Sequence, residues 1–282
     1  KASGSIAWRV FGPREQGVPD YGALLTHGRF VYWQVNDVVY ALDTQSGQIQ
    51  WRTPVAEGIA AIVAPEEAQM AIGNGVLLLR RSDRYHALDL LNGAERWTLS
   101  GLGTDNAGAP GGIVATGSEF VLYGGGVIEA FNSATQSMLW RHDNLGGIAN
   151  VTISQDGSLV YAVIFNTLNG APGEQSLVAF DVKINLIHWT FQPYTTAQLI
   201  YTGSNAIYGA QGMHGMLIVT TCQPGSSGGC THQNLYALDG NTGSVRWTLQ
   251  ARQFSNAQLS QDGETLTFQT YSSAWENLKA ML

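Results

Sequence analysis

Short runs of alternating apolar and polar residues recur along the whole chain. Runs such as residues 29–35 and 38–43 are rich in Val, Tyr and Trp, and Gly, Asn or Asp separates one run from the next. Alternation over four to eight residues predicts half-buried strands, and no stretch shows the 3.6-residue period of an amphipathic helix. Asp156-Gly157 and Asp262-Gly263 each separate two runs and predict tight turns with positive φ. The pattern predicts an all-β protein.

The runs belong to a repeat whose most regular part has eleven residues and extends from Ala to Trp. Five copies are intact, namely ALDTQSGQIQW (41–51), ALDLLNGAERW (87–97), AFNSATQSMLW (130–140), AFDVKINLIHW (179–189) and ALDGNTGSVRW (237–247). A sixth copy is split between the ends, because AML (280–282) followed by KASGSIAW (1–8) again has eleven residues from Ala to Trp. Successive tryptophans of the intact copies lie 43 to 58 residues apart.

A period of about 40–50 residues with several short strands is typical of a β-propeller. Each period is expected to hold four strands, A to D, with the repeated Trp on strand D. A propeller closes its ring because an open end leaves an unpaired strand edge. The sequence predicts one domain, 1–282: a six-bladed β-propeller of four-stranded antiparallel blades, with the N-terminal strand completing the last blade. The expected blades are residues 10–55, 56–100, 101–143, 144–192, 193–250, and 251–282 with 1–9.

The pattern A-[LF]-[DN]-x-x-x-G-x-x-x-W resembles the PQQ-like repeat of quinoprotein alcohol dehydrogenases and their non-catalytic relatives, and the resemblance covers the whole chain. It implies that each Trp packs on the adjacent blade, although stacking on a ring-shaped ligand is the alternative. The expected structural residues are Trp8, Trp51, Trp97, Trp140, Trp189 and Trp247. The Asp at the end of strand C is expected to accept backbone N–H bonds in the C–D turn. Gln136 and Asn185 replace the turn Gly, so looser turns are expected there.

Composition narrows the classes of partner. Charged residues make up 12% of the chain and the net charge is −7, which argues against nucleic acid as the main partner. Lysine occurs only at positions 1, 183 and 279, so no polybasic membrane patch exists. No apolar run approaches the ~18–20 residues of a membrane span. We expect a monomer trimmed from a larger precursor, with any anchor outside this chain.

Cys222 and Cys230 are the only cysteines and enclose a loop of Gly, Ser, Pro and Gln. A disulfide across this loop is expected, and it implies an oxidising compartment outside the cytoplasm. Two reduced thiols are the alternative. A zinc site is disfavoured because no His-Cys cluster with suitable spacing surrounds the pair.

The resemblance suggests one enzymatic alternative, a small PQQ- or metal-dependent oxidoreductase. PQQ dehydrogenases carry two adjacent cysteines over the quinone and a calcium site of carboxylates and an amide. Here the cysteines are not adjacent, and no position matches a calcium ligand or catalytic Asp of the family. The six histidines show no metal-binding spacing. We therefore expect a non-catalytic protein with no catalytic, cofactor-binding or metal-binding residues.

Connections at one end of the expected blades are long. They are the D–A loops 11–20, 101–112 and 191–205 and the B–C loops 166–175 and 222–233, whereas the A–B and C–D turns are nearly all tight. Long loops on a rigid frame often carry binding residues, and sequence drift at tolerant sites is the alternative. The candidate residues of this face are Arg14, Asp105, Asn106, Asn169, Tyr194, Tyr201, His232 and Gln233.

The function favoured by these observations is an extracytoplasmic binding scaffold for an unknown protein or small ligand. The resemblance includes propellers that serve as surface sensor domains of membrane-tethered kinases. It also includes the longer propeller of the outer-membrane assembly machinery.

Overall fold

In the computed structural model, every regular element of the described part is a β-strand. The described residues are 6–11, 23–35, 37–55, 70–81, 84–100, 112–154, 156–168, 171–193, 207–213, 215–224, 230–251, 254–259 and 266–270. Twenty-two strands fall within these ranges, and no helix does. The predicted all-β class is confirmed.

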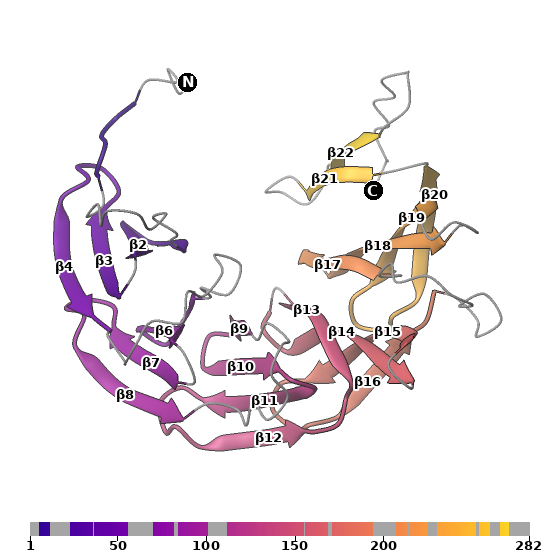
Figure 1. Ribbon diagram of the computed structural model, residues 1–282, viewed down its shortest axis with the longest axis horizontal. Coiled ribbons are helices and arrows are strands. Elements are labelled where there is room, and N and C mark those ends of the chain that lie inside the picture. Colours follow the sequence, from indigo (N-terminus) through magenta and orange to yellow (C-terminus); the bar gives the residue numbers. More distant parts are fainter. Residues whose placement is uncertain are drawn as a thin grey trace. The chain divides into compact units, whose positions relative to one another are not determined.

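The strands form five four-stranded sheets and one hairpin (Figure 1). The first sheet holds β1 (Leu24–His27), β2 (Phe30–Val35), β3 (Val38–Asp43) and β4 (Ile49–Pro54). The second holds β5 (Met70–Gly73), β6 (Val76–Arg81), β7 (Arg84–Asp89) and β8 (Glu95–Ser100). The third holds β9 (Gly112–Ala115), β10 (Glu119–Gly124), β11 (Val127–Asn132) and β12 (Met138–His142).

The fourth sheet holds β13 (Gly147–Ile153), β14 (Leu159–Leu168), β15 (Ala171–Asp181) and β16 (Ile187–Phe191). The fifth holds β17 (Ile207–Met213), β18 (Met216–Pro224), β19 (Cys230–Asp239) and β20 (Val245–Ala251). The hairpin pairs β21 (Phe254–Leu259) with β22 (Leu266–Thr270). Within each sheet, strands that follow one another in sequence are neighbours, which is the A-to-D order of a propeller blade.

The chain divides into two compact units. The first comprises residues 1–125 and 131–137 and contains the first and second sheets. The second comprises residues 126–130 and 138–282 and contains the fourth and fifth sheets and the hairpin. Residues 1–5 and 271–282, which the closing of a sixth sheet requires, lie outside the described residues. A closed ring of six blades therefore stays a prediction.

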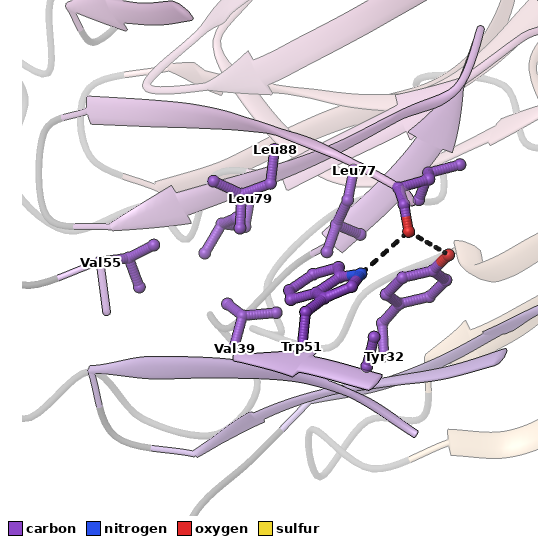
Figure 2. Close-up of a cluster of buried hydrophobic side chains, with 9 residues drawn as sticks. Tyr32, Val39, Trp51, Val55, Leu77, Leu79 and Leu88 are labelled. Carbon is purple, nitrogen blue, oxygen red and sulfur yellow. Dashed lines mark hydrogen bonds between the residues drawn. The ribbon is translucent and has the colours of Figure 1, made fainter. Parts of the chain in front are cut away.

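The core of the first unit lies between the first and second sheets. Figure 2 shows Tyr32, Val39 and Trp51 of the first sheet facing Leu77 and Leu88 of the second. These residues share one face of their strands, so each sheet turns an apolar face to its neighbour, although most adjacent residues in β2, β3, β6 and β7 are at least partly buried as well. In the second unit, a similar cluster of buried side chains joins the fourth and fifth sheets; it includes Tyr161, Val163, Leu177, Leu217 and Leu238.

The C–D turns have one geometry in all five sheets. The residue that ends strand C accepts hydrogen bonds from the backbone N–H groups two and three residues further on, and these acceptors are Asp43, Asp89, Asn132, Asp181 and Asp239. The expected role of the repeated Asp is confirmed.

The expectation of a looser turn is wrong at Gln136, and Asn185 has the same backbone φ. Both residues have φ of 59°, in the same left-handed region as Gly47 at 71°. The Gln136 N–H donates to the Asn132 carbonyl at 2.9 Å, as the Gly47 N–H donates to that of Asp43 at 2.8 Å. The side-chain acceptor at the start of the turn holds this conformation without glycine.

Two expected B–C loops are mostly strand. The ladder between β14 and β15 continues to the pair Leu168–Ala171, within the expected loop 166–175. The ladder between β18 and β19 continues to Pro224–Cys230, within the expected loop 222–233. Polar residues dominate both segments, so their strand character is hidden in the pattern of apolar positions.

Candidate functional site

Most residues of the expected binding face lie outside the described part of the chain. Those residues are Arg14, Asp105, Asn106, Asn169, Tyr194 and Tyr201. His232 and Gln233 are described, and both belong to β19 rather than to a loop. Gln233 is only 7% exposed, so the expectation of an exposed loop tip is corrected for this residue. Gln233 belongs to a strand and not to a loop because it pairs with Cys222 of β18.

The two cysteines occupy the facing strands of one hairpin. Cys222 is in β18 opposite Gln233, and Cys230 opens β19 opposite Pro224. The two cysteines therefore lie on paired strands, but the backbone register does not place them directly opposite each other. The disulfide stays a prediction.

The repeated tryptophans form the joints between sheets. Trp51 on β4 is 8% exposed, and its indole Nε1 donates to the Leu90 carbonyl at 3.0 Å (Figure 2). The Tyr32 hydroxyl donates to the same carbonyl at 3.3 Å. Thr53 adds a bond from its hydroxyl to the Gly93 carbonyl at 2.7 Å. Strand D of the first sheet is thus fastened to the C–D turn of the second.

The same joint recurs with different partners. The Trp140 indole donates to the Val182 carbonyl at 2.5 Å, and the Trp189 indole donates to that of Gly240 at 2.9 Å. In each case the acceptor is the residue directly after the Asp of the C–D turn. Trp97 packs edge-on against Phe120, with ring centroids 6.5 Å apart. Trp247 differs from the others, because it packs against Met216, Ile218, Leu235 and Ala237 of its own sheet.

Trp8 makes this joint although no described strand contains it. Its indole donates to the Thr44 carbonyl at 2.8 Å, and Thr44 follows Asp43 in the first C–D turn. A Cβ added to Gly47 would lie 2.7 Å from the Trp8 ring, so the indole rests directly on this glycine. Trp8 therefore occupies the place that Trp51 has on the second sheet.

Ion pairs reinforce the C–D turns. The Arg29 guanidinium lies 2.5 Å from Asp43, and this hydrogen bond, followed by the backbone N–H of Ser46, lowers the pKa of Asp43 to about 2. Arg96 holds Asp89, and Arg246 holds Asp239, and both bonds lower the pKa of the carboxyl. These carboxylates are engaged within their own sheet, which is a structural use of charge.

A charged cluster on the third repeat was not found by sequence reasoning. Arg141 on β12 bonds the Glu129 carboxylate at 2.9 Å and the Asp143 carboxylate at 2.7 Å. Burial raises the pKa of Glu129, and Arg141 opposes that shift. Glu129 follows the B–C turn closely and Asp143 follows β12, so the cluster lies at the end of the sheet that carries the B–C and D–A connections. The signal was a Glu before the motif Ala, where other copies have Tyr40, His86, Val178 and Tyr236.

Among the described residues, no group of three or more His, Cys, Asp or Glu residues is arranged to hold a metal ion. The described part of the chain contains no helix that is long and apolar enough to cross a membrane.

Comparisons with known proteins indicate a family. A family model described as outer membrane protein assembly factor BamB matches residues 1–107, 35–183 and 81–258. The protein of that name from Yersinia pestis is 28% identical over 185 residues, which are 60% of this chain and 42% of the relative. The chain thus spans about two fifths of the length of this curated relative.

Solved structures show the same fold at low identity. BamB from Moraxella catarrhalis is 15% identical with a TM-score of 0.55, and the match covers 88% of this chain and 68% of that one. Quinohemoprotein alcohol dehydrogenase from Comamonas testosteroni is 14% identical with a TM-score of 0.54, over 85% of this chain and 44% of that one. At such identities the likeness concerns the fold alone, and the predicted PQQ-like repeat is confirmed.

Proposed function

The chain belongs to the family of PQQ-like repeat proteins described as outer membrane protein assembly factor BamB, and from this premise we propose that it is a non-catalytic, extracytoplasmic scaffold that binds other proteins. The repeated joint carries the proposal. The repeated Trp and Asp are occupied in fastening sheets and closing turns, as Trp51 and Asp43 illustrate. Function is then left to the connections that vary between sheets. The name of the matched relatives, an assembly factor, supports a protein partner.

The finer architecture that we propose is a single propeller of six blades, 1–282, closed by the N-terminal segment. Trp8 supports this proposal because it contacts the first C–D turn as the strand-D Trp51 contacts the second. Residues 6–8 would then belong to strand D of a sheet that precedes the first and contains β21 and β22. Such a ring leaves no open sheet edge at the chain ends.

The proposed binding face is the end of the sheets with the B–C and D–A connections. It would include the loop candidates Arg14, Asp105, Asn106, Asn169, Tyr194 and Tyr201. The Glu129–Arg141–Asp143 cluster supports this choice, because it presents the partly exposed guanidinium of Arg141 and the Asp143 carboxylate at that end. Charged groups with fixed geometry favour selection among protein partners.

Photo-crosslinking in the native host tests this proposal. A benzoylphenylalanine is placed at Tyr194 or Asp105, and as control at Leu91, which lies on a C–D turn at the other end and is exposed. Crosslinks to a defined cell-envelope protein from the two loop positions, and none from Leu91, are expected. Asp105→Lys should weaken the crosslink at Tyr194 without shifting the unfolding curve. A pattern in which Leu91 alone crosslinks would refute the face.

The non-catalytic part of the proposal has a separate test. Purified protein is mixed with PQQ and calcium, and the quinone absorbance is followed after addition of primary alcohols. We expect no reduction of the quinone above the rate without protein. Turnover that depends on the protein would replace the scaffold proposal by the oxidoreductase alternative.

A further inference from the structure

The C–D turn of the fourth sheet differs from the others in its side chains. In the other four turns, the third residue after the Asp or Asn is polar and hydrogen-bonded within the turn. These residues are Ser46, Asn92, Thr135 and Thr242. In the fourth turn this residue is Ile184, and Leu186 stands where the others have Gln48, Ala94, Ser137 and Ser244. The fourth turn has replaced a polar, self-bonded tip by two large apolar side chains.

The backbone of this turn does not require the apolar residues. Asp181 accepts hydrogen bonds from the N–H groups of Lys183 at 2.7 Å and Ile184 at 3.0 Å, as in the other turns. The Asp181 N–H donates to the Leu186 carbonyl at 2.8 Å, and the corresponding bond of Asp239 has the same length. The choice of Ile and Leu therefore has no explanation within the turn itself.

The apolar side chains are open to solvent and close together in the sequence. Ile184 is 68% exposed, Leu186 is 53% exposed, and Ile187 at the start of β16 is 49% exposed. A single exposed apolar residue is ordinary, and Leu91 on the second C–D turn is an example. The position of Ile187 is also exposed and apolar in three other sheets, at Ile49, Met138 and Val245, and only the fourth sheet adds Ile184 and Leu186 to it. Three exposed apolar residues within four positions make this the most apolar of the five turns, and exposed apolar patches mark sites of interaction.

A positive charge adjoins this cluster. Lys183 is exposed, is the only lysine among the described residues, and forms no ion pair with any of them. The neighbouring Asp181 carboxylate is directed inward, to the turn N–H groups and to His188 Nε2 at 3.5 Å. The charge that the tip offers to a partner is therefore positive, although the whole chain has a net charge of −7. A carboxylate is the complementary group.

The site is held in place before any partner binds. The Trp140 indole donates to the Val182 carbonyl directly before the tip, and its ring stacks on Phe180 at 6.1 Å. Val182 is fully buried. Because the base of the turn is fixed, little conformational entropy is lost when a partner covers its tip.

The cluster adjoins the edge of a sheet, which suits an extended segment. The cluster continues into β16, which is the last strand of its sheet and so offers unpaired backbone groups along its outer edge. An extended chain can satisfy such groups while its side chains cover the apolar tip.

We propose that residues 183–187 form a docking site for an extended apolar segment of a partner protein that carries a carboxylate beside its apolar side chains. The site lies at the C–D end of the fourth sheet, whereas the face proposed above lies at the B–C and D–A end. It does not depend on that face, and either assignment can fail without the other.

A labelled peptide tests the proposal. The probe is a fluorescein-tagged peptide with alternating Leu and Thr preceded by Glu, and its match has Lys in place of Glu. Fluorescence anisotropy with the full chain should show tighter binding of the Glu peptide. Ile184→Thr combined with Leu186→Ser, which restores the residue types of the fifth turn, should weaken binding about tenfold or more. Lys183→Glu should reverse the preference between the two peptides.

Leu91→Ser is the matched control, because it removes a single exposed apolar residue from the equivalent turn of the second sheet. It should leave binding unchanged, and circular dichroism should show that every variant is folded. The proposal is overturned if the wild-type chain binds neither peptide, or if the double variant binds as tightly as the wild type. It is also overturned if the wild-type chain is a dimer that the double variant dissociates, since the occupant would then be a second copy.

Discussion

At the residue scale, glycines with the same backbone conformation are required for different physical reasons. Gly28 in the first A–B turn and Gly93 in the second C–D turn have φ of 59° and 71°. A Cβ at Gly28 would meet nothing within 4 Å. A Cβ at Gly93 would lie 2.5 Å from the Trp51 ring. Glycine is favoured at position 28 only by the left-handed backbone of the turn. At position 93 it is favoured both by the left-handed backbone and by the close approach of the Trp51 indole.

Alanine substitutions separate these two causes. Gly28→Ala should lower the free energy of unfolding by about 1–2 kcal/mol, the cost of an L-residue in the left-handed region. Gly93→Ala should cost at least about twice as much, because the methyl group also displaces Trp51 from its bond with the Leu90 carbonyl. Urea unfolding of both variants measures the difference. Equal losses would show that the indole moves aside at no cost.

The low pKa of Asp43 makes stability depend on pH. Its pKa is about 2 in the folded chain against an ordinary value of 3.8, so the carboxylate stabilises the fold above about pH 4. This contribution is lost as the pH falls through about 2. Asp43→Asn keeps the turn acceptor, as Asn132 does in the third sheet, but removes the charge. In urea unfolding, the variant should lose less stability than the wild type between about pH 6 and about pH 3. Parallel losses would contradict the assignment.

At the scale of elements, the sequence predicted best where apolar alternation and turn residues agree. Residues 38–43 were expected as strand C and form β3 with the same bounds. The pattern failed at β14 and β15, because residues 166–175 have few apolar side chains and their pairing depends on the facing strand. It also overrated glycine in the C–D turn, because the Asn132 side chain secures the turn at Gln136.

A glycine at position 136 is expected to stabilise the C–D turn of the third sheet. Its backbone has φ of 59° and its side chain is exposed, so Gln136→Gly removes strain without removing buried contacts. We expect the free energy of unfolding to rise by about 1 kcal/mol. Ser137→Gly is the control, because that residue has no positive φ and the change should be neutral or destabilising. A lower melting temperature for Gln136→Gly would show that the side chain contributes contacts of its own.

At the scale of the whole molecule, the repeat predicted the order of strands within each sheet, but it did not predict which carbonyl groups accept the hydrogen bonds of the repeated tryptophans. The sequence indicated that each Trp packs on the next sheet. The carbonyl that it meets lies 36 to 51 residues away and carries no side-chain signal. The same limit applies to the site. Loop length pointed to one end of the sheets, whereas the Glu129–Arg141 pair required the register of β11 and β12.

The N-terminal segment offers the most direct test of the proposed ring. If residues 1–9 complete the sheet of β21 and β22, their deletion removes a paired strand together with the Trp8 joint, whereas Trp8→Ala removes the joint alone. The deletion should then lower the melting temperature clearly more than Trp8→Ala does. Trp8→Ala itself should lower the free energy of unfolding by about 3–5 kcal/mol or less, since Trp8 is only partly buried. Hydrogen exchange should become faster, for the deletion only, around residues 280–282, because strand C of the proposed sheet would lose its neighbour. Equal melting temperatures and unchanged exchange there would mean that the segment serves only the first sheet, and the ring would have to close in another way.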